Sequence, residues 1–284
     1  MAVIDSLGPA ARGRRLDTFG HLNESAPTDD LKGRLEQDGY LFIRGLLDRD
    51  EVIEGREDLL AHADELTQTY PMGSAAMQHV VHGPRIMGFF DALFQTPARS
   101  YDFIWLRHQR PSHGIPPHCD TVFMGRGTPD VLTAWIPFGD IPIRAGGLMV
   151  LEHSHKLSQQ SLADYLEQDV DSYCENGPNA QAVASGAMKW EHWRDQTDWN
   201  GEITEDPHQL ARDWNTRWLT ADFRMGDVLI FTMRTVHAGT DNEIDPLRLS
   251  TDSRYQPANQ PIDDRWIGEH PIGHGLEAKQ GRIC

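Results

Sequence analysis

Short apolar runs bounded by glycine and proline recur along most of this chain, a pattern that is typical of β-strands. The runs that predict strands cover residues 40–43, 101–107, 131–138, 148–151, 218–223, 228–236 and 247–255. Strands this short and this numerous predict a sheet-rich fold, in which residues far apart in the sequence meet.

Helical spacing of apolar residues is confined to the N-terminal third of the chain. A short helix is predicted to begin after a cap at Thr28 or Asp29 and to end at Gly39. A longer helix is expected over 48–66 and another near 86–94. Together with the strands, these helices predict a mainly β fold, a double-stranded β-helix (jelly roll) with flanking N-terminal helices.

Two segments follow neither pattern. Residues 1–26 have few large apolar groups and are expected to form an N-terminal arm. Residues from about 156 to 217 are rich in Gln, Asp, Asn and Trp, which predicts an insertion between barrel strands that is too long for a turn. A lid and a static structural cap are both compatible with this composition. We expect a single domain over residues 1–284, since one all-β unit often reaches this size.

The formal net charge of −17 argues against nucleic acids and anionic membranes as partners, because both attract basic surfaces. A small-molecule substrate is expected instead, and an anionic one stays open because a local basic pocket is compatible with this charge. No run approaches about 20 apolar residues, so no membrane span is expected. The three cysteines, Cys119, Cys174 and Cys284, are widely separated and predict no disulfide framework, which favours a reducing, cytoplasmic location.

The candidate chemistry centres on the stretch Pro116–Asp120. If it is a strand, His118 and Asp120 project to one side and Cys119 to the other. A second imidazole from another strand would complete the two-histidine, one-carboxylate set that binds non-haem Fe(II). His237 is the candidate, because it ends the apolar run 228–236. The triplet alone is weak evidence, since the chain has 14 histidines.

The segment after His237 strengthens this hypothesis. A polar turn at 239–242 is followed by Arg248 and Ser250, which share one face if the chain returns as a strand. A guanidinium with a hydroxyl beside it is suited to binding a carboxylate at two points. The alternative is that Arg248 pairs with one of the many acidic side chains, as surface arginines usually do.

At these residues the chain resembles the phytanoyl-CoA dioxygenase (PhyH)-like family of Fe(II)/2-oxoglutarate-dependent oxygenases. The segments that carry the resemblance are 38–46, His118-Cys119-Asp120, Ala145–Leu148 through 153–156, Gly226-Asp227-Val228, His237 with Arg248, and 254–257. The resemblance implies a jelly roll and a dioxygenase that hydroxylates an unactivated carbon of a small molecule. It implies Fe(II), 2-oxoglutarate and O2 as cofactor and co-substrates, with release of succinate and CO2.

The resemblance also implies roles for individual residues. His118, Asp120 and His237 would bind the iron, and Arg248 would hold the distal carboxylate of 2-oxoglutarate with Ser250 as its hydroxyl partner. Three further side chains, Trp135, Thr133 and Arg107, would line the same pocket. The substrate, the carbon oxidised and the oligomeric state are not implied.

Other readings of the sequence stay open beside this one. His153 and His155 form a second possible ligand pair, although hydrogen bonding at a strand end is the simpler role. Arg126 could contact the substrate or co-substrate, or brace a loop. No basic cluster suits a CoA phosphate group, so an acyl-CoA substrate is not expected.

The same residues argue against three other functions. A halogenase would need a small residue in place of Asp120. A zinc-dependent hydrolase leaves Arg248 and Ser250 without a role. A catalytically inactive small-molecule-binding module is disfavoured because all three ligands and the arginine are present.

Overall fold

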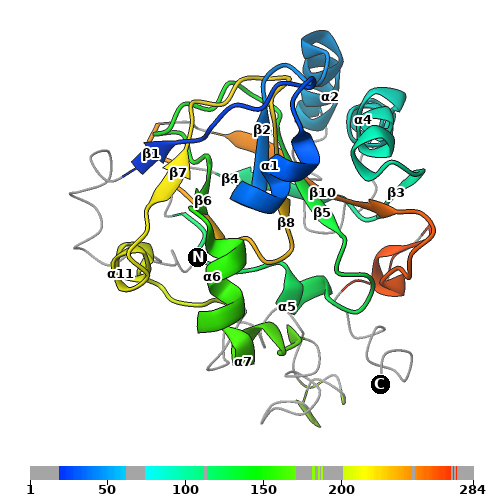
Figure 1. Cartoon of the computed structure of the whole chain (residues 1–284). Coiled ribbons are helices and arrows are strands. Elements are labelled where there is room, and N and C mark those ends of the chain that lie inside the picture. Colours follow the sequence, from blue (N-terminus) through cyan, green and yellow to red (C-terminus); the bar gives the residue numbers. More distant parts are fainter. Residues whose placement is uncertain are drawn as a thin grey trace.

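Two β-sheets pack face to face at the centre of the protein, and helices cover the outer face of one of them (Figure 1). The structure, a computed structural model, describes residues 19–61, 74–109, 111, 114–170, 181–182, 185, 187, 201–244, 247–269, 271 and 273. Cys174, Cys284 and most of the insertion between 171 and 200 lie outside these residues. The sheets form a jelly roll of two layers and not a closed barrel.

The larger sheet has six strands, all paired in antiparallel fashion. Its order is β2 (Tyr40–Ile43), β8 (Val228–Thr232), β5 (Leu132–Pro137), β10 (Arg248–Pro257) and β3 (Ala98–Ser100), with β4 (Trp105–Gln109) also paired to β10. The long strand β10 therefore lies in the middle, with β5 on one side and β3 and β4 on the other.

The smaller sheet has four strands in the order β1 (Phe19–His21), β7 (Trp218–Thr220), β6 (Leu148–Leu151) and β9 (His237–Gly239). The β1–β7 pair is parallel and the other pairs are antiparallel. Since β1 belongs to the predicted N-terminal arm, the arm is not wholly outside the fold. Its residues 1–18 lie outside the described residues.

Four helices precede most of the strands: α1 (Leu31–Asp38), α2 (Arg49–Ala61), α3 (Ala75–His82) and α4 (Pro84–Phe94). The cap of α1 is Asp30, whose carboxylate accepts the backbone N–H of Gly33, and not the predicted Thr28 or Asp29. Gly39 ends the helix as predicted, in the left-handed conformation with φ of 78°. The remaining helices within the described residues are α5 (Thr121–Met124), α6 (Ser154–Ser161), α7 (Ala163–Leu166), α11 (Pro207–Asp213) and the 3₁₀ turn η1 (Asp264–Trp266).

Strand alternation gives the six-stranded sheet two different faces. One face carries Ile43, Ile136 and Ile230, which pack with Val52 of α2 and Phe90 of α4 in a buried apolar cluster. The opposite face carries Phe42, Trp135 and Leu229, which pack with residues of the four-stranded sheet such as Leu148 and Leu219. The candidate site lies on this second, inner face.

The apolar run 228–236 is not the single strand that the sequence predicted. It forms β8, then a turn in which the N–H of Thr235 donates to the carbonyl of Thr232 at 3.0 Å, and then β9, which His237 begins. The carbonyl of Gly39 holds this turn, accepting the N–H of Thr232 at 3.2 Å and the hydroxyl of Thr235 at 2.7 Å. The chain thereby crosses from one sheet to the other, which places His237 opposite the inner face.

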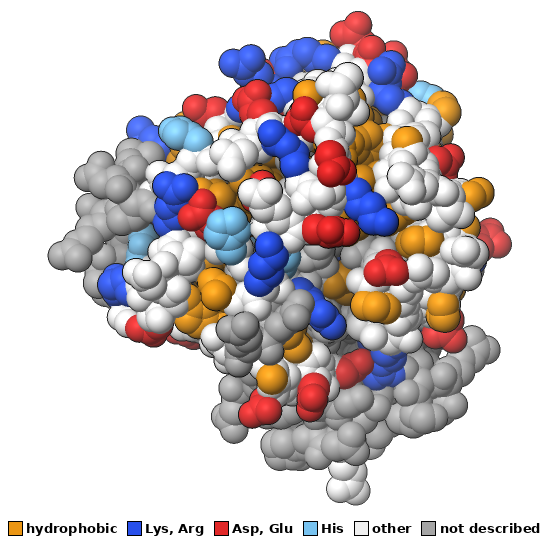
Figure 2. Space-filling model, in the orientation of Figure 1, with side chains coloured by type: hydrophobic (Ala, Val, Ile, Leu, Met, Phe, Trp, Pro, Cys, Tyr) orange, Lys and Arg blue, Asp and Glu red, His pale blue; other side chains and the backbone are white. Residues whose placement is uncertain are grey.

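Lys and Arg side chains are interspersed with Asp and Glu on the face shown in Figure 2. Ion pairs elsewhere in the described residues include Arg44 with the buried Asp227 and Arg49 with Asp140. Among the described residues, no helix is both long enough and apolar enough to cross a membrane.

Candidate metal centre

Three side chains from distant parts of the sequence converge at one end of the inner face. One ligand atom from each of His118, Asp120 and His237 lies within 4.8 Å of the others, and no other group of this kind occurs within the described ranges. The two histidines are paired backbone to backbone, each N–H donating to the other's carbonyl at 3.1 Å. The convergence predicted from the sequence is therefore present.

The backbone that presents His118 and Asp120 is not the regular strand that was predicted. Only His118 makes a β-bridge, while Asp120 is helical, with φ of −66° and ψ of −23°, and begins α5. Pro116 and Pro117 have no N–H to donate to a ladder, which explains why no strand forms. The side chain of Cys119 still points away from the two neighbouring ligand positions, as predicted, since its Sγ lies 3.5 Å from the carbonyl oxygen of Arg234.

Both imidazoles are oriented by backbone carbonyls. Nδ1 of His118 lies 2.8 Å from the carbonyl oxygen of Pro116, and Nδ1 of His237 lies 3.0 Å from that of Thr235. A carbonyl only accepts, so each Nδ1 carries the proton and each Nε2 is left as a lone-pair donor. Burial, aided by the neighbouring His237, lowers the pKa of His118 to about 3, which keeps this ring neutral at physiological pH.

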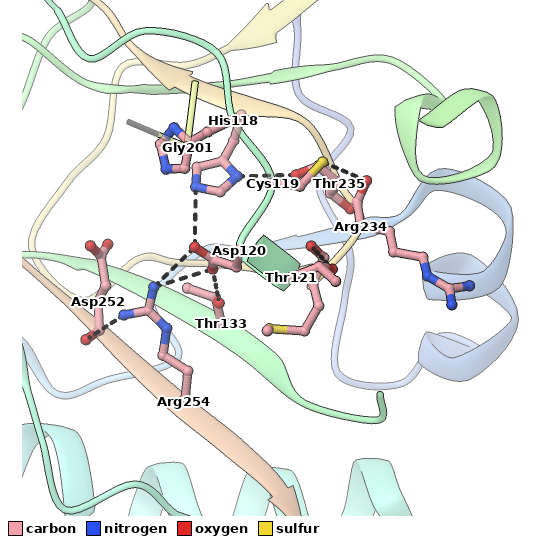
Figure 3. Close-up of polar contacts among 12 residues, drawn as sticks. His118, Cys119, Asp120, Thr121, Thr133, Gly201, Arg234, Thr235, Asp252 and Arg254 are labelled. Atoms are coloured by element: carbon pink, nitrogen blue, oxygen red, sulfur yellow. Dashed lines mark hydrogen bonds and ion pairs between the residues drawn. The ribbon is translucent and has the colours of Figure 1, made fainter. Parts of the chain in front are cut away.

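Asp120 is 2% exposed and has two polar partners besides the histidines (Figure 3). The hydroxyl of Thr133 donates to Oδ2 at 2.5 Å, and Nη2 of Arg254 lies 3.2 Å from each carboxylate oxygen. Burial alone would raise the pKa of the carboxyl, but Arg254 first, then the two imidazoles and Thr133, hold it well below its usual value. The ligand set thus combines one carboxylate with two imidazoles, which suits a divalent iron.

Arg248 is buried on the same face, as strand alternation predicted. Its Nη1 donates to the hydroxyl of Ser250 at 2.6 Å, and its Nη2 donates to the side-chain carbonyl of Gln109 on β4. The register pairs Arg248 directly with Gln109. Arg248 is 4% exposed, so it is not the surface arginine of the alternative reading.

The other predicted pocket residues also lie on the inner face, in different settings. Thr133 contacts Asp120 directly, whereas Arg107 donates to the carboxylate of Asp252 at 2.7 Å. Trp135 is 2% exposed and packs edge-on against Phe223 at 4.7 Å between the sheets. Their roles toward 2-oxoglutarate stay predictions.

The second histidine pair is placed elsewhere. Nε2 of His155 lies 3.1 Å from the carbonyl oxygen of Glu36, and His153 is exposed beside Tyr40 and Glu152. Within the described ranges, neither belongs to a group that could hold a metal. Arg126 makes two hydrogen bonds to the carboxylate of Asp169, at 2.7 and 3.0 Å. Of the two roles considered from the sequence, this contact favours bracing a loop.

Described residues of the insertion hold the backbone of the metal-binding segment. The hydroxyl of Tyr165 accepts the N–H of Cys119 at 3.1 Å and donates to the carbonyl of Gly201 at 2.7 Å. The N–H of Ile203 donates to the carbonyl of Pro117 at 2.8 Å. These contacts flank His118 on both sides, so this part of the insertion supports the site.

The sequence patterns did not predict two residues of the site, Arg254 and Gln109. For Arg254 the signal was available, because Arg248, Ser250, Asp252 and Arg254 alternate along one strand and share its face. Gln109 had no such signal, since its partner is set by the register between β4 and β10.

Comparison with known proteins agrees with this geometry. The phytanoyl-CoA dioxygenase (PhyH) family matches residues 35–248. The chain belongs to this family. Because the family consists of Fe(II)/2-oxoglutarate-dependent oxygenases, membership confirms the predicted class of enzyme and its use of iron and 2-oxoglutarate.

The relatives span nearly the whole chain at low identity. The 1-deoxypentalenic acid 11-beta-hydroxylase of Streptomyces arenae is 24% identical over 277 residues, covering 86% of this chain and 87% of that protein. The enzyme of the same name from Streptomyces exfoliatus is 24% identical over 279 residues, with the same coverage.

Solved structures share the fold. The carbocyclase SnoK from nogalamycin biosynthesis has a TM-score of 0.59 at 18% identity and covers 85% of this chain and 90% of its own. The epimerase SnoN, crystallised with Fe3+, alpha ketoglutarate and nogalamycin RO, has a TM-score of 0.54 at 24% identity, covering 82% and 84%. The predicted jelly roll with flanking helices is thereby confirmed.

Proposed function

We propose that this protein hydroxylates an unactivated carbon of a small-molecule substrate with O2, converting 2-oxoglutarate to succinate and CO2. The observation that carries the proposal is the convergence of His118, Asp120 and His237, with ligand atoms within 4.8 Å of one another. The names of the two Streptomyces relatives support hydroxylation as the outcome. SnoK and SnoN are named for ring closure and epimerisation, so the outcome must be measured and not assumed from the fold.

Each proposed ligand fits the group it would hold. The rings of His118 and His237 offer Nε2 to the metal, because Nδ1 is engaged with a backbone carbonyl in both. The carboxylate of Asp120 supplies negative charge, and three protein ligands leave positions for 2-oxoglutarate and O2. Bound iron with 2-oxoglutarate and O2 supplies the oxidising chemistry.

The remaining side chains bind, orient and exclude water. The buried guanidinium of Arg248, with the hydroxyl of Ser250 at 2.6 Å, would hold the distal carboxylate of 2-oxoglutarate. Phe123 stands edge-on to the ring of His118 at 5.6 Å, and Phe231 lies 4.5 Å from that of His237. These aromatic rings shield the imidazoles from solvent.

The test is an anaerobic titration with Fe(II) and 2-oxoglutarate, followed by the weak visible charge-transfer band of the chelate and by succinate release with candidate substrates. We expect the wild type to show the band and His237→Ala to lose it, together with turnover. The exposed His21 at the end of β1 is a matched control, and His21→Ala should behave as the wild type. Iron binding without the band, or turnover supported by zinc, would instead favour a hydrolase.

A further inference from the structure

Arg254 is almost fully buried yet points its charge at the proposed metal ligand. The side chains of Arg254 and Asp120 are 2% and 3% exposed, and their separation is 3.2 Å. Nη2 of Arg254 is equidistant from both carboxylate oxygens, so this one nitrogen bridges them (Figure 3).

The guanidinium is itself held in place from several directions. Its Nη1 donates to the carbonyl of Asp252 at 3.3 Å, and its face lies 4.0 Å from the ring of Trp105. Trp105 in turn packs against Phe103 at 4.5 Å and Trp266 at 4.7 Å. Arg254 is therefore a fixed group and not a mobile counter-ion.

The two oxygens of Asp120 face different neighbours. Oδ2 accepts the hydroxyl of Thr133 at 2.5 Å, whereas Oδ1 lies 3.8 Å from Nε2 of His237. In the sheet register Thr133 lies directly opposite Arg254, so both contacts come from one pair of positions on β5 and β10. Oδ1 is the oxygen turned toward the imidazole nitrogens.

Asp120 needs such help because its backbone does not fix its side chain. It begins the four-residue helix α5 and has no strand partner of its own. Without these two partners, a buried carboxylate at this position would be free to turn away from the imidazoles. The clamp formed by Arg254 and Thr133 is the structural feature that prevents this.

We propose that Arg254 is a positioning residue which, with Thr133, holds the carboxylate of Asp120 turned so that Oδ1 faces the metal site before iron arrives. This inference rests on the proposed ligand set His118, Asp120 and His237. Arg254 does not touch iron or substrate, and acts only through Asp120.

A role in positioning Asp120 and a role in balancing its charge predict different changes in metal affinity when Arg254 is removed. A fixed cation this close to the site repels Fe(II), so its removal would leave iron binding unchanged or make it tighter. A positioning role predicts weaker binding, because second neighbours of metal ligands typically change affinity by about 10–100-fold. The sign of the change therefore separates the two roles.

The experiment measures the Fe(II) dissociation constant anaerobically in two ways. One is the charge-transfer band that appears with 2-oxoglutarate, and the other is the rise in melting temperature when Fe(II) is added to the iron-free protein. For Arg254→Met we expect about 10–100-fold weaker binding. Arg254→Lys keeps the charge but loses the guanidinium that the Asp252 carbonyl and Trp105 hold in place, so it should also bind iron more weakly than the wild type. Thr133→Val removes only the hydroxyl and should give a smaller loss of the same sign.

Arg265 provides the matched control. It forms another fully buried arginine–aspartate pair, with Asp263 at 2.5 Å, and lies over the ring of Trp266 at 5.5 Å, but it does not contact the ligands. Arg265→Met should lower the thermal midpoint as Arg254→Met does, while the folded fraction keeps the wild-type affinity for Fe(II).

Equal or tighter iron binding in Arg254→Met would overturn the proposal. Should Arg254→Met fail to fold, wild-type affinity in both Arg254→Lys and Thr133→Val would overturn it equally. These outcomes leave the proposed function intact as long as the wild type binds iron and His237→Ala does not. Absence of iron binding by the wild type would overturn both.

Discussion

The two faces of the six-stranded sheet are both buried, but they are built from different chemistry. On the helix side, Ile136, Ile230 and Phe90 form a cluster whose energy comes from removing apolar surface from water. On the inner side, the strands β5 and β10 present Thr133, Arg248 and Arg254, which hydrogen bonds and ion pairs fix in place. The helix side is held mainly by apolar packing, whereas the inner side adds these polar contacts to the apolar cluster around Trp135.

The difference teaches where stability and function reside in this fold. A core of apolar side chains tolerates changes that keep its volume, and it loses stability in proportion to the volume removed. A buried polar network loses a specific geometry when one partner is removed, because the remaining partner is left unsatisfied. Substitutions on the two faces should therefore separate stability from iron and 2-oxoglutarate binding.

The largest expected effect is on the helix side. Phe90 is fully buried and stacks on Tyr255 at 3.9 Å, so Phe90→Ala should lower the free energy of unfolding by about 3–5 kcal/mol. Denaturant unfolding measures this loss, and the folded fraction should bind Fe(II) as the wild type does. Phe94→Ala, at a partly buried position of the same helix, should cost less. A tenfold fall in iron affinity in Phe90→Ala would show that the two faces are coupled.

The next effect is on the inner side and concerns 2-oxoglutarate. Hydrogen bonds to charged groups contribute about 1.5–3 kcal/mol, so Arg248→Ala should raise the 2-oxoglutarate requirement by about 10–100-fold. The iron affinity should change little, because Arg248 contacts Ser250 and Gln109 and not the ligands. Steady-state kinetics at varied 2-oxoglutarate measures the effect. The control is Arg144→Ala, at an exposed arginine paired with Glu243; an unchanged requirement in Arg248→Ala would refute the assignment.

The smallest effect is a pH dependence that arises on the helix side. Burial lowers the pKa of His82 in α3, on the helix side, so there is a pH range in which the unfolded chain is protonated at this residue and the folded protein is not. The associated stability is complete above the unfolded pKa of about 6.5 and is lost as the pH falls below it.

Between pH 7 and 5 this residue can remove at most about 2 kcal/mol from the free energy of unfolding. His82→Gln should reduce the fall in the urea midpoint over this range, whereas His21→Gln, at an exposed histidine, should not. An identical pH profile in His82→Gln and the wild type would contradict the prediction.

Much of this arrangement could be read from local patterns in the sequence. Alternation placed Arg248 and Ser250 on one face, and the spacing of residue types pointed to His118, Asp120 and His237. The pattern misled where the backbone departs from regular geometry: Pro116 and Pro117 prevent a strand, and the turn before His237 divides one apolar run between two sheets.

The sequence by itself determined the ligand types, the sheet-rich architecture and the order of the strands along the chain, because these depend on side-chain chemistry and on short-range periodicity. The tertiary structure alone decided that Arg254 and Thr133 meet on Asp120, that Gln109 faces Arg248, and that Tyr165 and Ile203 hold the backbone around His118. The physical reason is that these contacts join residues whose separation is set by strand register and sheet packing, and no local pattern encodes which distant polar groups will be buried together.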